Sequence, residues 1–269
     1  MRKHNIDRYD VLGALLLPIV LLGALLLLNL LNNLCNQWHP TVKLPGTWEV
    51  AKSVVVTAKN SAVWFALYHT IKISLVATIV AAIIGLSVGF SLAYDKRVWQ
   101  LCQPSLDMLR SIPVTFLVPP IAIITGVKSP LLAYLLAFCP AFLFMVLSAR
   151  QGVIRHDIDR SKAFEFFSGR CNRIEQFWKI LIPEAMPEIF HGLKLSVSYA
   201  LVIVTVLEYF DVGPKGGIGQ QIRTFYDNVQ YAAGFVTIAY VGTVGYILNK
   251  VLDLACHRTM HWSQFEIES

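Results

Sequence analysis

The chain has 269 residues, of which 55% are hydrophobic and only 15% are charged. Soluble domains carry roughly a quarter charged residues, so this composition excludes an ordinary soluble domain. The formal net charge of +6 does not indicate nucleic acid, because the Lys and Arg residues gather in segments that the topology below places on one side of a membrane. We therefore predict an all-α membrane protein of about six transmembrane helices, each of ~20 apolar residues.

Residues 1–68 are predicted to hold a first span and an external segment. Basic residues precede an apolar run from Val11 to Leu31, which is longer than the ~7–15 apolar residues of a signal peptide. We expect an uncleaved span that runs from the cytoplasm outward. Beyond it, Trp48–Phe65 is a candidate interfacial helix, with its aromatic side chains at headgroup depth.

A membrane core is predicted over residues 69–260, and residues 261–269 form a short cytoplasmic tail. The first span of this core, about Thr70–Tyr94, contains Gly85 and Gly89, a spacing that permits close helix packing. Lys72 lies near its outer end. The lysine either extends its ammonium group to the interface or lines an anion path.

Three prolines interrupt the next predicted span, which covers about Ile112–Val127 and follows an amphipathic connector at residues 98–110. The prolines are Pro113, Pro119 and Pro120. A broken helix survives at membrane depth only where neighbouring helices or water satisfy its freed carbonyls. We therefore expect this span to lie inside the bundle as part of a path, before a fourth span at about Leu131–Ser148 returns inward.

Residues 149–188 are the longest charged stretch, and they mix basic and acidic residues, which indicates solvated, folded helices. Spans at about Ile189–Phe210 and Tyr231–Cys256 follow, joined by a glycine-rich outer loop at Gly213–Gly219. About sixteen of the 23 Lys and Arg residues then face the cytoplasm, and this bias predicts that both termini are cytoplasmic.

Glu208 lies near the outer end of the fifth span, where an ionisable group is by default a candidate for a transport pathway. A structural pairing with Tyr209, Lys215 or the glycine-rich loop is an equally open alternative. The loop lacks the residue order of a phosphate-binding loop, and the chain has no Walker motif. His257 and His261 have no third metal ligand nearby. The sequence thus predicts no catalytic residue, no metal site and no cofactor in this chain.

The stretch Gln176–Pro187, followed by Gly192-Leu193-Lys194-Leu195, resembles the end of the EAA loop of bacterial ABC-importer permeases of the binding-protein-dependent type. The likeness extends over roughly residues 70–260 and includes Leu109–Pro113, Glu208, Gly213 and Gly217-Ile218-Gly219. It is nearest to the subfamily that handles sulfonates, taurine, nitrate, bicarbonate and pyrimidine precursors.

The first half of the loop departs from the family pattern. Lys162-Ala163-Phe164 stands where Glu-Ala-Ala is expected, and Ile182 replaces the leucine before the final proline. The loop glycine, Gly169, and the final proline, Pro183, both come later than in the pattern. This spacing indicates an insertion within Ser168–Ile174.

The resemblance implies a type I importer permease in the bacterial inner membrane, whose loop 161–187 forms a coupling helix that docks on a separate ATPase. The apolar face, its charged rim and the turn of that helix are supplied by Ala163, Phe164, Phe167, Gly169, Arg170, Ile174, Phe177, Trp178, Ile182 and Pro183. Candidates for the translocation path or gate are Lys72, Pro113, Pro119, Pro120, Glu208 and Gly213.

The implied partners are two ATPase subunits that bind ATP and Mg²⁺, a second permease copy in a homodimer, and an extracytoplasmic solute-binding protein. The implied solute is a small anion such as a sulfonate, nitrate or bicarbonate, or a pyrimidine vitamin precursor. The alternative is an ATP-independent channel or secondary transporter. The fourth and sixth spans carry almost no mid-membrane charge and no internal repeat is evident, which favours the importer.

Overall fold

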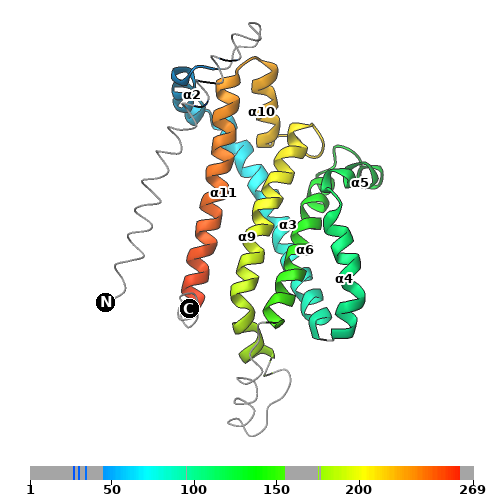
Figure 1. The fold of residues 1–269 in the computed structure, drawn as a ribbon. Helices are drawn as coiled ribbons and strands as arrows, with labels where there is room; N and C mark the ends of the chain where they lie inside the picture. The colour runs from blue at the N-terminus through cyan, green and yellow to red at the C-terminus, as the bar shows by residue number, and fades with distance from the viewer. Residues whose placement is uncertain are drawn as a thin grey trace, which may run out of the picture.

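The computed structural model describes residues 45–94, 96–154 and 177–260, together with Leu27, Leu30, Leu34 and Glu175. Over these residues the secondary structure is helical, and they contain no strand (Figure 1). The prediction of an all-α membrane protein is confirmed. The predicted first span, apart from Leu27 and Leu30, and the tail 261–269 lie outside the described residues.

Four helical segments are long and apolar enough to cross a membrane. They are α3 (Ser61–Tyr94), α6 (Pro130–Ile154), α9 (Ile182–Tyr209) with the preceding π-helix η2 (Phe177–Leu181), and α11 (Tyr231–Thr259). A fifth crossing is possible through α4 (Lys96–Ser111) and the short helices η1 (Val114–Leu117) and α5 (Val118–Thr125), which together form a bent pair. Among the described residues, four of the five spans predicted after residue 69 are therefore found, and the bent pair lies in the place of the predicted third span.

The predicted interfacial helix at Trp48–Phe65 is wrong in its extent. Helix α2 (Thr47–Lys59) ends at Asn60, whose φ and ψ of −82° and 105° leave the helical region. The side chain of Asn60 then accepts a hydrogen bond from the backbone N–H of Ala62 at 3.1 Å, and α3 begins at Ser61 instead of Thr70. Asparagine at this position thus ends one helix and caps the next.

The predicted third span, Ile112–Val127, also begins too late. The segments 97–111 and 114–125 meet at 91°, and α5 has only eight residues, so most of this crossing consists of the expected connector, α4 (Figure 1). Only Pro113 lies at the break, since proline lacks an N–H group and disfavours a helical residue before it. Pro119 and Pro120 lie in the first turn of α5, where an N–H group has no intrahelical partner, so they do not interrupt that helix.

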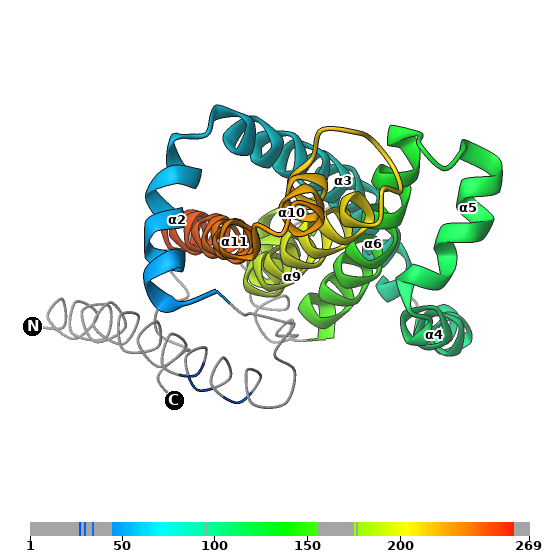
Figure 2. The same cartoon turned by 90° about the horizontal axis from the view of Figure 1, so that it is seen from above.

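Helices α3, α6 and α9 form the centre of the bundle (Figure 2). Gly85 and Gly89 of α3 face α6, where a Cβ on Gly89 would lie 2.7 Å from the Cβ of Ala149 and 2.8 Å from the carbonyl oxygen of Val146. The predicted packing role of this glycine pair is therefore confirmed. Around this centre, α2 lies across α11, while α4 and α5 stand on the far side of α6 (Figure 2).

We predict that Gly89→Ala destabilises the bundle by about 1–3 kcal/mol, the usual cost of overpacking a core, because the new methyl group meets backbone atoms that have no room to move. Gly242→Ala in α11 is the matched control, since nothing lies within 4 Å of its Cβ position. Unfolding in mixed micelles with rising SDS measures both. Equal stability of the two variants would contradict the packing described here.

Candidate coupling and outer-loop sites

The predicted ATPase-docking residues divide into two groups. Ala163, Phe164, Phe167, Gly169, Arg170 and Ile174 lie outside the described residues. Phe177 and Trp178 lie in η2, and Ile182 and Pro183 open α9, at the lower end of the bundle in Figure 1. The segment 149–188, expected as a loop, thus begins within α6 and ends within α9.

Helix α6 extends beyond the predicted end of the fourth span, Ser148, because its last turns remain packed. Arg150 donates a hydrogen bond to the carbonyl of Ala93 at 3.2 Å, and its guanidinium lies 5.1 Å from the ring centre of Trp99. Gly152 is so close to Ala185 of α9 that a Cβ would overlap that residue. These contacts keep residues 149–154 helical despite their polarity.

The two aromatic residues of η2 face different surroundings. The ring of Phe177 packs edge-on against Phe90 of α3, with the ring centres 5.4 Å apart. Trp178 is 64% exposed, whereas Ile182 and Pro183 are half-buried. Among these four predicted docking residues, Trp178 therefore offers the accessible apolar surface and Phe177 holds the start of α9 against α3.

A continuous helical segment connects this end of the bundle to the other. It runs over 33 residues from Phe177 to Tyr209, and it is fixed against α6 at Ala185 and again at Gly192, where a Cβ would overlap Ser148. Close-packed interiors transmit displacement with little compression. A displacement of Trp178 along the helix is therefore carried towards Glu208.

Glu208 is buried, with 1% of its surface exposed, beneath the glycine-rich loop. Its Oε2 accepts a hydrogen bond from Thr70 Oγ1 of α3 at 2.7 Å and one from the backbone N–H of Gly219 at 3.2 Å. Thr70 Oγ1 in turn accepts a hydrogen bond from the N–H of Ile218 at 2.9 Å. We call Thr70, Glu208, Ile218 and Gly219 the outer network, because they join α3, α9 and the N-terminus of α10 (Ile218–Asp227).

Glycines make room for this carboxylate. A Cβ on Gly217 would overlap the Glu208 carboxylate, and one on Gly219 would overlap the carbonyl oxygen of Thr205. The Oε1 atom of Glu208 lies 4.0 Å from His69 Nδ1, and neither atom has a hydrogen-bond partner in the part of the chain that the structure describes. The N-terminus of α10 and two donated hydrogen bonds are thus directed at the carboxyl group of Glu208.

The outer loops are held together by a second set of contacts near Gly213. Lys128, in the α5–α6 turn, donates a hydrogen bond to Asp211 Oδ2 at 2.9 Å, and Gln220 donates one to Asp211 Oδ1 at 3.2 Å. The N–H of Gly213 donates to the carbonyl of Val127 at 2.8 Å, and its φ of +99° favours glycine. The Lys128 ammonium holds the pKa of Asp211 below its usual range.

The structure brings together only some of the predicted path residues. Glu208 and Gly213 lie near the same outer loop, whereas Lys72 is exposed on α3 and the three prolines are exposed on the segment that includes η1 and α5. Of the alternatives for Glu208, the geometry shows contact with the glycine-rich loop through Gly219, and Thr70 as the side-chain partner.

Sequence reasoning missed Thr70, His69, Lys128 and Asp211. Thr70 and Glu208 are 138 residues apart in the sequence, and Lys128 and Asp211 are 83 residues apart. No local pattern of residues marks pairings over such separations. The signal that sequence reasoning used was an ionisable residue near the end of a predicted span, and it pointed to Glu208 alone.

Comparison with known proteins adds independent findings. Residues 81–257 match the family model described as "Binding-protein-dependent transport system inner membrane component". A probable ABC transporter permease of Brucella abortus (strain 2308) is 23% identical over 227 residues, which cover 83% of this chain and 87% of that protein. The putative aliphatic sulfonates transport permease SsuC of Bacillus subtilis (strain 168) is 27% identical over 262 residues, covering 94% and 89%.

The fold is also similar to a solved structure. A chain of the MetNI methionine ABC transporter, in an inward-facing conformation, superposes with a TM-score of 0.58 at 17% identity, covering 74% of this chain and 95% of that one. The chain belongs to the family of inner membrane components of binding-protein-dependent transport systems, and it is a permease subunit of the ABC-importer class. The resemblance and the fold class inferred from the sequence are thereby confirmed.

We predict that Thr70→Val loosens the outer loop, since it removes a donor to Glu208 and the acceptor for Ile218. Leaving buried polar groups unpaired costs about 1–3 kcal/mol. Thr78→Val, also buried in α3 but bonded only to the carbonyl of Ser74 of its own helix, is the control. Hydrogen exchange at residues 216–219 is expected to quicken in Thr70→Val alone, and equal exchange in both variants would refute the role of the network.

A pH dependence follows from Asp211. Because its folded-state pKa is depressed, its stabilisation of the loop is present above the ordinary value of about 3.9 and is lost as pH falls through the lowered pKa. Carbon NMR of Asp-labelled protein, assigned with Asp211→Asn, measures this titration. Lys128→Ala is expected to return it towards the ordinary value, whereas Lys215→Ala should have a smaller effect. An unchanged titration in Lys128→Ala would contradict the pairing.

Proposed function

We propose that two copies of this chain form the translocation path of an importer for a small oxyanion, driven by two separate ATPase subunits that bind ATP and Mg²⁺. The ATPases dock on loop 161–187, and an extracytoplasmic binding protein delivers the solute to the outer loops. In this proposal both termini are cytoplasmic and the membrane is a bacterial inner membrane. The chain itself performs no catalysis.

One observation carries this proposal: a single helical segment links an exposed docking residue to the outer network. Trp178 lies at one end of the segment Phe177–Tyr209 and Glu208 lies at the other. An ATPase that moves η2 therefore shifts the carboxylate to which the outer loop is bonded. Glu208 is bonded to α3 through Thr70 and to α10 through Gly219. A movement of Glu208 therefore either preserves or breaks these two hydrogen bonds.

The choice of solute is supported by the relatives rather than by the path. The relative that aligns over 94% of this chain is named as a putative aliphatic sulfonates transport permease. A sulfonate, nitrate or bicarbonate shares a compact, delocalised negative charge. A pyrimidine precursor lacks that charge, so an uptake panel separates the two kinds of solute.

The docking proposal predicts that Trp178→Ala weakens association with the ATPase by about tenfold or more, since exposed aromatic residues dominate many interfaces. Trp48→Ala is the matched control, because Trp48 is 80% exposed in α2 at the opposite end of the bundle. Co-purification with the ATPase subunit measures association, and reconstituted vesicles measure ATP-dependent uptake. Full association in Trp178→Ala would refute the docking role of this residue.

The same vesicles test the solute and the energy source. Uptake of a labelled alkanesulfonate, nitrate or bicarbonate should require both ATP and the binding protein. Uptake of these anions without ATP would instead establish a channel or secondary transporter. Uptake restricted to a pyrimidine precursor would overturn the oxyanion proposal and leave the importer assignment intact.

A further inference from the structure

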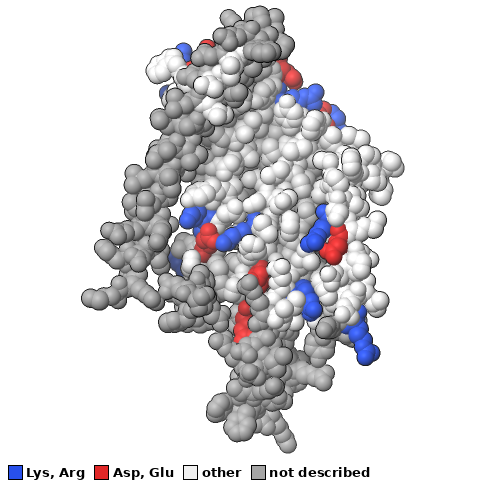
Figure 3. Space-filling model, viewed as in Figure 1, with Lys and Arg blue, Asp and Glu red and all other residues white. Residues whose placement is uncertain are grey.

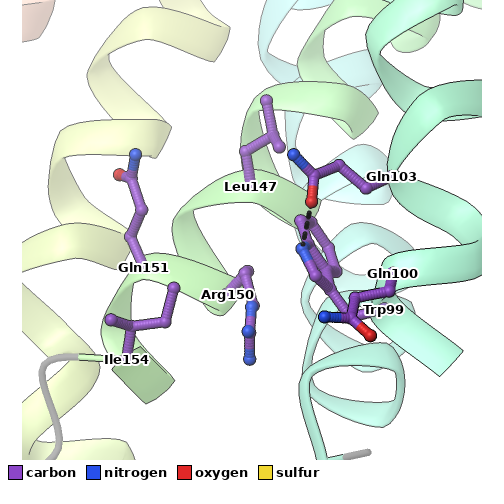
Figure 4. A pocket seen from close by; sticks show the side chains of 7 residues that line it. All are labelled: Trp99, Gln100, Gln103, Leu147, Arg150, Gln151 and Ile154. Atoms are coloured by element: carbon purple, nitrogen blue, oxygen red, sulfur yellow. Dashed lines mark hydrogen bonds between the residues drawn. The ribbon is translucent and has the colours of Figure 1, made fainter. Parts of the chain in front are cut away.

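A cavity of about 400 Å³ lies between α4 and α6, near the end of the bundle where α3 ends and α9 begins (Figure 4). Its described lining contains an arginine, three glutamines and a tryptophan, and it contains no carboxylate. Two apolar residues, Leu147 and Ile154, complete it. None of these residues belongs to the predicted docking surface or path, or to the outer network.

Arg150 supplies the positive charge of the cavity. One of its terminal nitrogens, Nη1, donates to the carbonyl of Ala93, and the ring of Trp99 covers its guanidinium. Its Nε–H is buried and has no hydrogen-bond partner among the residues that the structure describes. Among the described residues, this half-buried arginine thus keeps one donor unused and has no carboxylate in the cavity lining to balance its charge.

The glutamines supply further donors. The indole Nε1–H of Trp99 donates to Gln103 Oε1 at 3.1 Å, and because an indole is a donor only, this bond fixes the orientation of the carboxamide. The Nε2 group of Gln103 is then the end that can donate elsewhere. Gln100 lies opposite Arg150 across the cavity, with its side chain directed towards it (Figure 4).

We propose that this cavity binds an oxyanion, with Arg150 as the cation and the carboxamides of Gln100 and Gln103 as neutral donors. Guanidinium groups match the geometry of phosphate and sulfonate oxygens, and the Trp99 ring fixes the guanidinium plane before the ligand arrives. The shared ligand chemistry is a tetrahedral oxyanion. Its source is either the phosphate of an anionic phospholipid, whose acyl chains would run past Leu147 on the membrane side of Arg150, or a free anion such as sulfate or phosphate.

The experiment uses the full chain in nanodiscs and has two arms. In the first, nanodiscs contain phosphatidylglycerol in phosphatidylcholine, and native mass spectrometry counts the phosphatidylglycerol that stays bound. In the second, sulfate or inorganic phosphate is titrated into phosphatidylcholine-only nanodiscs, and tryptophan fluorescence is followed, with Trp99→Phe to assign the signal. Neither arm needs an ATPase or a binding protein, so the result is independent of the proposed transport.

Arg150→Gln is expected to weaken retention or raise the anion concentration at half-saturation by tenfold or more, and Arg150→Lys to restore binding only in part. Arg110→Gln is the control, because Arg110 is an exposed residue of α4 that pairs with Asp107. Gln100→Ala, at an exposed lining position, should weaken binding several-fold, and it tests the site independently if Arg150→Gln does not fold. Phosphatidylglycerol retention identifies a lipid, and a saturable fluorescence change identifies a free anion. Absence of both, or identical behaviour of Arg150→Gln and Arg110→Gln, overturns the proposal.

Discussion

The closeness of the backbones of α3, α6 and α9 is the constraint on which the rest of the structure depends. Gly85 and Gly89 admit α6 to α3, and Gly152 and Gly192 admit α9 to α6. In a lipid environment apolar side chains gain little from meeting one another, so close packing of small residues supplies much of the attraction between helices. Helices packed at such distances change their mutual positions only by small sliding movements that keep them in contact.

The packing of α3, α6 and α9 determines how the outer network and η2 can move relative to each other. Thr70 is on α3, and Glu208 and Trp178 lie at opposite ends of the segment that includes α9. A relative shift of the two helices acts directly on the hydrogen bond between Thr70 and Glu208. The carboxylate is thus placed where a small helix displacement changes the contacts of a whole outer loop. The cavity at Arg150 lies between α4 and α6, outside this centre.

Much of the fold could be predicted because long apolar runs, the glycine spacing of α3 and the charge bias are local or additive features of the sequence. The positions of α6, α9 and α11 followed from them. The errors arose where one residue decides the backbone. Asn60 ends α2 by its extended backbone and caps α3 by a side-chain hydrogen bond, and Pro119 and Pro120 lie in the first turn of a helix at a place where the prolines suggested a break. For the site, Glu208 was identified as an ionisable residue near the end of a predicted span, but Thr70 is 138 residues away in the sequence and only the folded chain shows the pairing.

The composition of α4 has a consequence for how the protein is made. This helix carries four charged residues near its two ends, Lys96, Arg97, Asp107 and Arg110, and a proline, Pro104, near its middle. A helix of this composition gains less from transfer into lipid than the apolar helices α3 and α6. We therefore expect α4 to take its place only after α6 has been synthesised. Biogenesis would then include a late step in which a polar helix packs against neighbours that are already inserted.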